Sequence, residues 1–321
     1  MPKDTARRPR SATAVFALGI CLALLVGLGA WLLLGRESAP PCSDLTVNAR
    51  VQKSVGEAVR PGMSCQALGE AIVKASVGDD QGNHTLAQAQ ALKDVLTTLG
   101  AQGTGGGAVD PALRRPLAVA LTDYAPDLHA MLGGITIEDF VTKAAPEAPP
   151  WESDGTHHLT VLTDTLRNVV RGIAEDPDAY AMLRLAETRT TGQRLTAVPT
   201  DAKEYSLSVP PTEGARALGV LDGIADSVTR DLDEKQAQEW RAAVVDGVDD
   251  GRTSTERGLA ATWLDGLHGF PEEQRYERLR TQGVDMTRLW TEHRNMDGPT
   301  RQGLLAEVER SALTAYREVK V

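Results

Sequence analysis

Residues 218–232 read LGVLDGIADSVTRDL, and their apolar side chains recur every three or four positions. This spacing is typical of an α-helix, because it places one apolar stripe on one helix face. Comparable stripes occur through much of the chain. They comprise Leu113, Leu117, Leu121, Tyr124 and Leu128; Leu159, Leu162, Leu166, Val169 and Ile173; Leu218, Leu221, Ile224, Val228 and Leu232; and Leu305, Val308, Ala312 and Tyr316. The periodicity predicts an all-α fold.

Helix starts and strand signals support the same fold class. Asp110-Pro111 and Asp176-Pro177 each place a capping carboxylate before a proline at the first helical position. The strand signal is confined to Tyr205, Leu207 and Val209, which alternate with polar residues. We therefore expect at most one short strand or hairpin beside the helices.

Three irregular stretches, 101–110, 145–155 and 197–212, interrupt the helical pattern with glycine or proline. They separate a membrane-proximal helical hairpin over 36–100, a helical segment over 108–196 and a C-terminal helical segment over 212–321. Aromatic residues make up only 4% of the chain, so each segment is short of large core side chains. We expect the three segments to pack together as one domain.

An uncharged stretch near the start predicts a membrane anchor. Residues 11–35 read SATAVFALGICLALLVGLGAWLLLG, which as a helix spans roughly 37 Å against about 30 Å of hydrocarbon. The stretch is longer than the apolar core of a cleaved signal peptide, which favours an uncleaved signal-anchor. Residues 1–10 hold four basic side chains and one acidic one. By the positive-inside rule, this tail is cytoplasmic and the chain after residue 35 is extracytoplasmic.

Small residues recur within the predicted anchor. Gly19, Ala23 and Gly27 lie four positions apart and share one helix face. Two membrane helices can approach closely along such a face, which would give a homodimer. The alternative is that glycine and alanine are simply common in membrane helices of this composition. In either case the expected partner of residues 11–35 is the lipid bilayer.

The charge balance argues against nucleic acid as a partner. The chain has 34 basic and 44 acidic side chains, and the first 35 residues hold four of the basic ones and one of the acidic ones. The remainder therefore carries 30 basic and 43 acidic side chains, a net charge of −13. An acidic domain repels phosphate backbones, so we expect no nucleic-acid binding.

The cysteine positions predict one disulfide. Cys21 lies inside the predicted membrane helix, whereas Cys42 and Cys65 lie on its outer side with 22 residues between them. A helix leading outward from Ser43 and a Pro61-Gly62 turn would bring the two sulfurs together. An oxidising compartment would then allow a Cys42–Cys65 disulfide.

No short motif establishes a catalytic, metal or cofactor site. The segment 246–257 fits a calcium loop poorly, because Val248 and Arg257 occupy two ligand positions. Glu152, Asp154 and His157 form the least implausible reactive group, although they also suit a helix start. We expect no cofactor and no metal site.

Two classes of function are compatible with these observations. The favoured hypothesis is a single-pass, membrane-anchored extracytoplasmic protein that acts as a non-catalytic scaffold or partner-binding module of the cell envelope. The alternative is a cell-envelope hydrolase that uses Glu152, Asp154 and His157.

Overall fold

Helices dominate the computed structural model, which describes residues 42–319 apart from 79, 81, 102–108, 135–141 and 254. The described residues contain one two-stranded antiparallel sheet, and the prediction of an all-α fold is confirmed. The elements are α2 (Ser43–Val47), α3 (Ala49–Val55), α4 (Cys65–Ser76), α5 (Leu86–Gly100), α6 (Pro111–Asp123), α7 (Ala125–Gly133), β1 (Trp151–Ser153), β2 (Thr156–His158), α9 (Thr163–Ala174), α10 (Pro177–Ala197), α11 (Tyr205–Arg230), α12 (Glu234–Asp250), α13 (Leu259–Leu267), α14 (Glu272–Arg280), α15 (Gln282–His293) and α16 (Gly298–Val319).

The two Asp-Pro pairs begin helices as expected. The side chain of Asp110 accepts a hydrogen bond from the backbone N–H of Ala112 at the start of α6. Asp176 does the same for the first turn of α10, where its side chain accepts from the N–H groups of Asp178 and Ala179. Each aspartate therefore satisfies donors that the helix itself leaves unpaired.

The predicted strand at 205–209 is wrong, because these residues form the first turns of α11. The expected alternation of burial is absent: Tyr205 is 68% exposed, while Leu207 and Val209 are half-buried. The helix also incorporates Pro210 and Pro211. Proline lacks the N–H that an interior helical position donates, which made this segment read as irregular.

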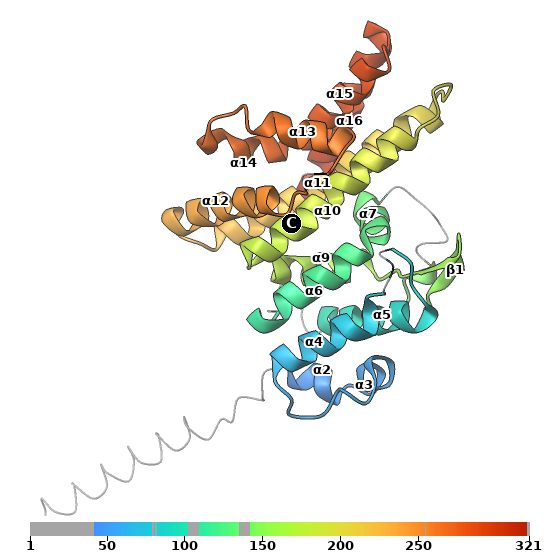
Figure 1. Ribbon diagram of the computed structural model, residues 1–321, viewed down its shortest axis with the longest axis vertical. Coiled ribbons are helices and arrows are strands. Elements are labelled where there is room, and N and C mark those ends of the chain that lie inside the picture. Colours follow the sequence, from blue (N-terminus) through green and yellow to red (C-terminus); the bar gives the residue numbers. More distant parts are fainter. Residues whose placement is uncertain are drawn as a thin grey trace, which may run out of the picture. The chain divides into compact units, whose positions relative to one another are not determined.

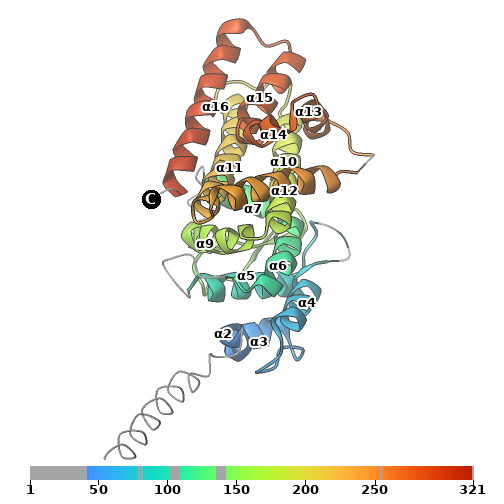
Figure 2. The ribbon, with the colours of Figure 1, turned by 90° about the vertical axis from the view of Figure 1, so that its left-hand side faces the viewer.

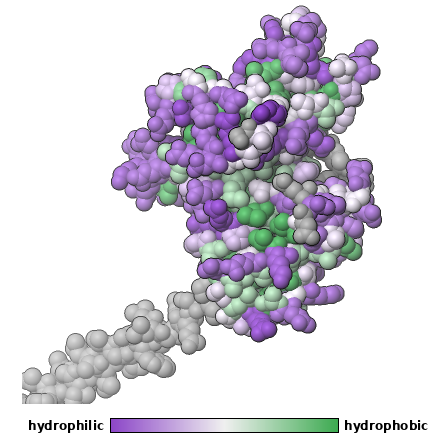
Figure 3. Space-filling model, viewed as in Figure 1, coloured by the Kyte–Doolittle hydropathy of each residue, from purple (hydrophilic) through white to green (hydrophobic). Residues whose placement is uncertain are grey.

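The described body is layered along its length. In both Figure 1 and Figure 2, helices α2–α5 lie at one end and α13–α16 at the other, with α10 and α11 between them. One connected set of buried apolar side chains extends from Leu45 to Ala315. The face in Figure 3 is mostly hydrophilic, with hydrophobic residues gathered near its middle. From Cys42 onward the chain forms one compact unit.

Two glycines allow α11 to pack closely against α16. A Cβ atom on Gly223 would lie 2.8 Å from the carbonyl oxygen of Tyr316, and one on Gly219 would lie closer still to that of Ala312. Real Cβ atoms do not approach a backbone oxygen so closely. The absence of side chains at these two positions therefore sets the distance between the helices.

A buried arginine joins four helices. Arg184 on α10 is 1% exposed, and its Nη1 atom lies 2.5 Å from Asp222 Oδ1 on α11. Its Nε donates to Gln282 Oε1 on α15 at 3.0 Å, and its Nη2 donates to the carbonyl of Leu279 on α14. The guanidinium is thus neutralised and hydrogen-bonded, as a buried charge requires.

The predicted disulfide between Cys42 and Cys65 is confirmed, with a Cα–Cα distance of 5.7 Å. The bond joins the residue before α2 to the first residue of α4. The segment between them forms two short helices, α2 and α3, followed by the turn at Pro61-Gly62. The bond therefore fixes this segment against the rest of the body.

The predicted membrane anchor over 11–35 and its dimer face at Gly19, Ala23 and Gly27 lie outside the described residues. Among the helices that the structure describes, none combines the length and apolar character needed to span a bilayer. The anchor, its orientation and the homodimer stay predictions.

Candidate functional site

The three residues considered for hydrolysis lie on a surface hairpin. Strands β1 and β2 pair antiparallel with Glu152 opposite His157, and Asp154 lies in the turn between the strands. Glu152 and Asp154 are exposed, and His157 is half-buried. These residues do not begin a helix, because α9 starts at Thr163. The hairpin therefore places Glu152 across from His157, beside the turn that holds Asp154. Their catalytic role stays a prediction.

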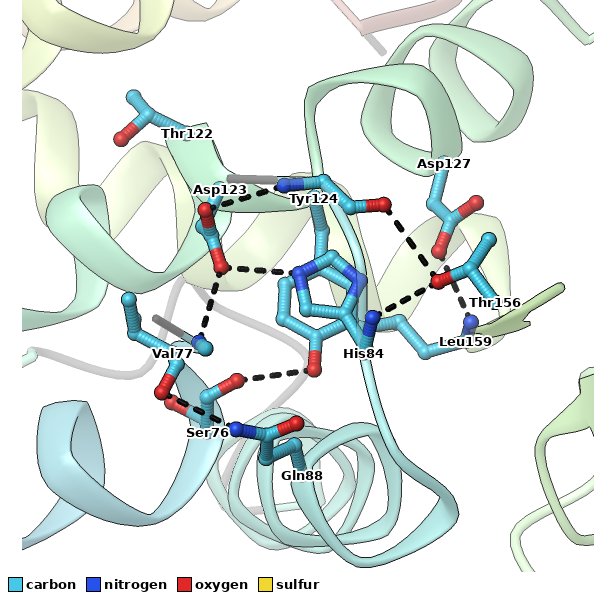
Figure 4. Close-up of polar contacts among 12 residues, drawn as sticks. Ser76, Val77, His84, Gln88, Thr122, Asp123, Tyr124, Asp127, Thr156 and Leu159 are labelled. Atoms are coloured by element: carbon cyan, nitrogen blue, oxygen red, sulfur yellow. Dashed lines mark hydrogen bonds and ion pairs between the residues drawn. The ribbon is translucent and has the colours of Figure 1, made fainter. Parts of the chain in front are cut away.

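Beneath the hairpin lies a buried histidine, shown in Figure 4, that the sequence did not single out. His84 is 5% exposed, and its Nε2 atom lies 2.8 Å from Asp123 Oδ2 at the end of α6. The imidazole stacks on the ring of Tyr124, with 3.5 Å between the ring centroids. The Tyr124 hydroxyl in turn donates to the carbonyl oxygen of Ser76 at 2.9 Å. The network ties the start of α5 to α4 and to the junction of α6 and α7.

The hairpin is attached to this network through its second strand. The N–H of His84 donates to Thr156 Oγ1 at 2.8 Å, and the N–H of His157 donates to the His84 carbonyl at 2.9 Å. At the end of β2, Asp127 lies 2.6 Å from His158 Nδ1 and accepts from the N–H of Leu159 at 2.9 Å. The histidines of the hairpin therefore have structural partners from α7 and the segment before α5.

The pairing of His158 with Asp127 predicts a pH-dependent contribution to stability. The hydrogen bond to Asp127 raises the pKa of His158, although burial opposes the shift. Folding thus strengthens proton binding, so the pair stabilises the fold at acidic pH. That contribution is lost as pH rises through the raised pKa.

We expect His158→Gln to lower the melting temperature more at about pH 5 than at about pH 9, because only the imidazolium gains the full charge interaction. Melting curves at the two pH values measure the effect. His293→Gln, at an exposed position on α15, is the control. An equal loss at both pH values would contradict the assignment.

An open cleft of about 780 Å³ runs along α10. One side of α10 forms its floor, from Met182 to Thr196, a length of roughly 21 Å at helical rise. One wall is the α6–α7 junction with Gly82, and the other runs from the end of α12 through Thr253 and residues 256–258 to the start of α13. Binding sites for small ligands commonly have volumes of this order.

The chemistry of the cleft is mixed. Leu185 and Ala186 give its floor an apolar part, while Thr190, Gln193 and Thr196 supply hydroxyl and amide groups. Such a surface can bury an apolar group of a ligand and fix its orientation by hydrogen bonds.

Charged residues brace both walls. Arg189 on the floor holds Glu256 with two hydrogen bonds, 2.8 Å from Nε and 3.0 Å from Nη2, and also donates to the carbonyl of Gly251. This contact fastens the α12–α13 loop to α10 and lowers the pKa of Glu256. On the opposite wall, Asp123 belongs both to the cleft lining and to the His84 network.

None of the residues proposed for hydrolysis lines the described cleft. The segment considered as a calcium loop does: Gly247, Gly251, Thr253, Glu256 and Arg257 all contribute to one wall.

A sequence signal for the hairpin was present but missed. Asp154-Gly155 has positive φ at both residues, 52° and 81°, as a type I′ hairpin turn requires.

Compared with known proteins, the chain shows no significant similarity to a family model, a curated protein or a solved structure.

Proposed function

We propose that this chain is a single-pass membrane protein whose helical body lies outside the cytoplasm and binds a partner in the cell envelope without catalysis. Residues 11–35 would be the anchor, with the N-terminal tail in the cytoplasm. The observation that carries the location is the Cys42–Cys65 disulfide, which begins shortly after the uncharged stretch. Structural disulfides persist chiefly in oxidising compartments outside the cytoplasm.

The cleft along α10 supports the binding role. Its floor includes apolar and hydrogen-bonding side chains, and the Arg189–Glu256 pair holds one wall in place. A preformed concave surface lowers the cost of ordering on association. We therefore place the partner in this cleft.

One labelling experiment tests both parts of the proposal. Gln193 is an exposed position on the cleft floor, whereas Lys235 on α12 has a side chain that is 84% exposed and does not line the cleft. Gln193→Cys and Lys235→Cys variants are expressed in cells with an intact cytoplasmic membrane. Each is treated with a membrane-impermeant maleimide that carries a photocrosslinking group.

Both cysteines are expected to react, because both lie outside the cytoplasm. On illumination, only the label at position 193 is expected to form a crosslinked adduct. If neither cysteine reacts until the membrane is opened, the proposed location is wrong. If both react but position 193 gives no more adduct than position 235, binding in the cleft is wrong.

A further inference from the structure

We propose that Cys42, Cys65 and Asp110, once the disulfide is reduced, form a binding site for a thiophilic divalent cation such as Zn²⁺. The two Sγ atoms and a carboxylate oxygen of Asp110 all lie within 4.8 Å of one another. The site is independent of the cleft along α10 and goes beyond the proposed function.

Regular structure holds two of the three ligands in place. Cys65 is the first residue of α4, and Asp110 caps the N-terminus of α6 through the 2.9 Å hydrogen bond from Ala112 to Oδ1. Helices α4 and α6 pack closely, since a Cβ atom on Gly69 would lie only 2.7 Å from Pro116 Cγ. The distance between Cys65 and Asp110 is therefore set by the helix packing, before any cation binds.

The burial of the three residues suits a metal site at the edge of the body. Cys65 is 6% exposed, whereas Cys42 and Asp110 are half-buried. Partial burial strengthens the attraction between a cation and anionic ligands and leaves a path for entry.

The donor set matches the coordination that zinc prefers. Zinc binds thiolate sulfur at about 2.3 Å and carboxylate oxygen at about 2.0–2.2 Å in tetrahedral geometry, which places two sulfurs roughly 3.8 Å apart. Rotation about the Cα–Cβ bonds of Cys42 and Cys65 can provide this separation after the S–S bond is broken. Two thiolates and one carboxylate fill three positions and leave the fourth for water.

The site forms in two steps, reduction of the disulfide and then binding of the cation. A dithiol reductant transfers two electrons and two protons to the Cys42 and Cys65 sulfurs, and it leaves as its own cyclic disulfide. The cation then replaces the two thiol protons, which pass to solvent, and forms two metal–sulfur bonds and one metal–oxygen bond. The disulfide and the metal complex are mutually exclusive, and each closes the same loop between residues 42 and 65.

Cobalt titration of the full-length protein in detergent tests the proposal. The Cys21→Ser variant is used throughout, so that signal arises from Cys42 and Cys65 alone. After reduction with a phosphine and removal of oxygen, Co²⁺ is added and the thiolate-to-cobalt charge-transfer absorption is recorded. We expect saturation at one Co²⁺ per chain, displacement by Zn²⁺ and no such band in the oxidised protein.

Two matched substitutions test the third ligand. Asp110→Asn keeps the helix cap, because asparagine caps as well as aspartate, but removes an anionic ligand. It is expected to weaken Co²⁺ binding at least about tenfold. Asp176→Asn makes the same change at the Asp-Pro cap of α10 and is expected to leave the affinity unchanged.

Absence of the charge-transfer band in the reduced protein would overturn the proposal. An Asp110→Asn affinity equal to that of the reference protein would overturn the assignment of Asp110 as a ligand. Since neither result depends on location or on the cleft, failure here is distinguishable from failure of the proposed function.

Discussion

Replacing Arg184 with methionine is expected to lower the free energy of unfolding by about 3–5 kcal/mol. The change keeps an unbranched chain of similar length but removes the guanidinium. It leaves the carboxylate of Asp222, whose side chain is 11% exposed, without its cation, and it leaves Gln282 and the Leu279 carbonyl without their donor. Burial already raises the pKa of Asp222 to about 6 despite the nearby arginine. Removing Arg184 should therefore also favour the neutral form of Asp222.

Chemical denaturation of the two proteins, followed by circular dichroism, measures this difference. Arg288→Met is the matched control, because Arg288 is 49% exposed and pairs with Asp285 on the same helix. Exposed pairs of this kind contribute about 0–1 kcal/mol. Equal losses for the two variants would show that Arg184 does not hold α10, α11, α14 and α15 together.

Replacing both Cys42 and Cys65 with serine is expected to cost about 3 kcal/mol of stability. The disulfide joins residues separated by 23 positions, and without it the unfolded chain gains the freedom of that loop. Helices α2 and α3 are short, so they depend on the loop closure more than longer helices would.

Denaturant unfolding of the double variant and of Cys21→Ser, with a chelator present, makes the comparison. Cys21 forms no part of the bond, so its substitution isolates the effect of the disulfide. If the double variant unfolds at the same denaturant concentration as Cys21→Ser, the disulfide contributes nothing to stability.

Local signals in the sequence predicted much of the helical architecture. Asp110-Pro111 and Asp176-Pro177 begin α6 and α10 because cap and proline chemistry act over a few residues. The disulfide was equally predictable from the sequence, since Cys42 and Cys65 are close in the chain and a turn lies between them.

Tertiary packing decided the places where prediction failed. The alternation at 205–209 pointed to a strand, yet these residues join α11, whose later turns pack against α7 and α16. The short hairpin at 151–158 carried the Asp154-Gly155 turn signal, but its polar residues also suited the start of a helix. His84 and Asp123 could not be paired in advance, because they are 39 positions apart and meet only when the fold brings the segment before α5 to the end of α6.

The cleft could not be read from the sequence for a similar reason. Its lining runs from Gly82 to Ala260 and combines residues from several helices. No residue type in it is unusual by itself. Only the crossing of α10 with the neighbouring helices brings Asp123, Arg189 and Glu256 to one concave surface.

The covalent link at the start of the described body also determines how tension would travel through it. A pull on the chain ahead of Cys42 passes across the sulfur–sulfur bond directly into α4. Helices α2 and α3 are bypassed and bear none of the load. The intervening residues hold a hidden length of roughly 80 Å when fully extended. Mechanical extension of the oxidised molecule cannot release that length.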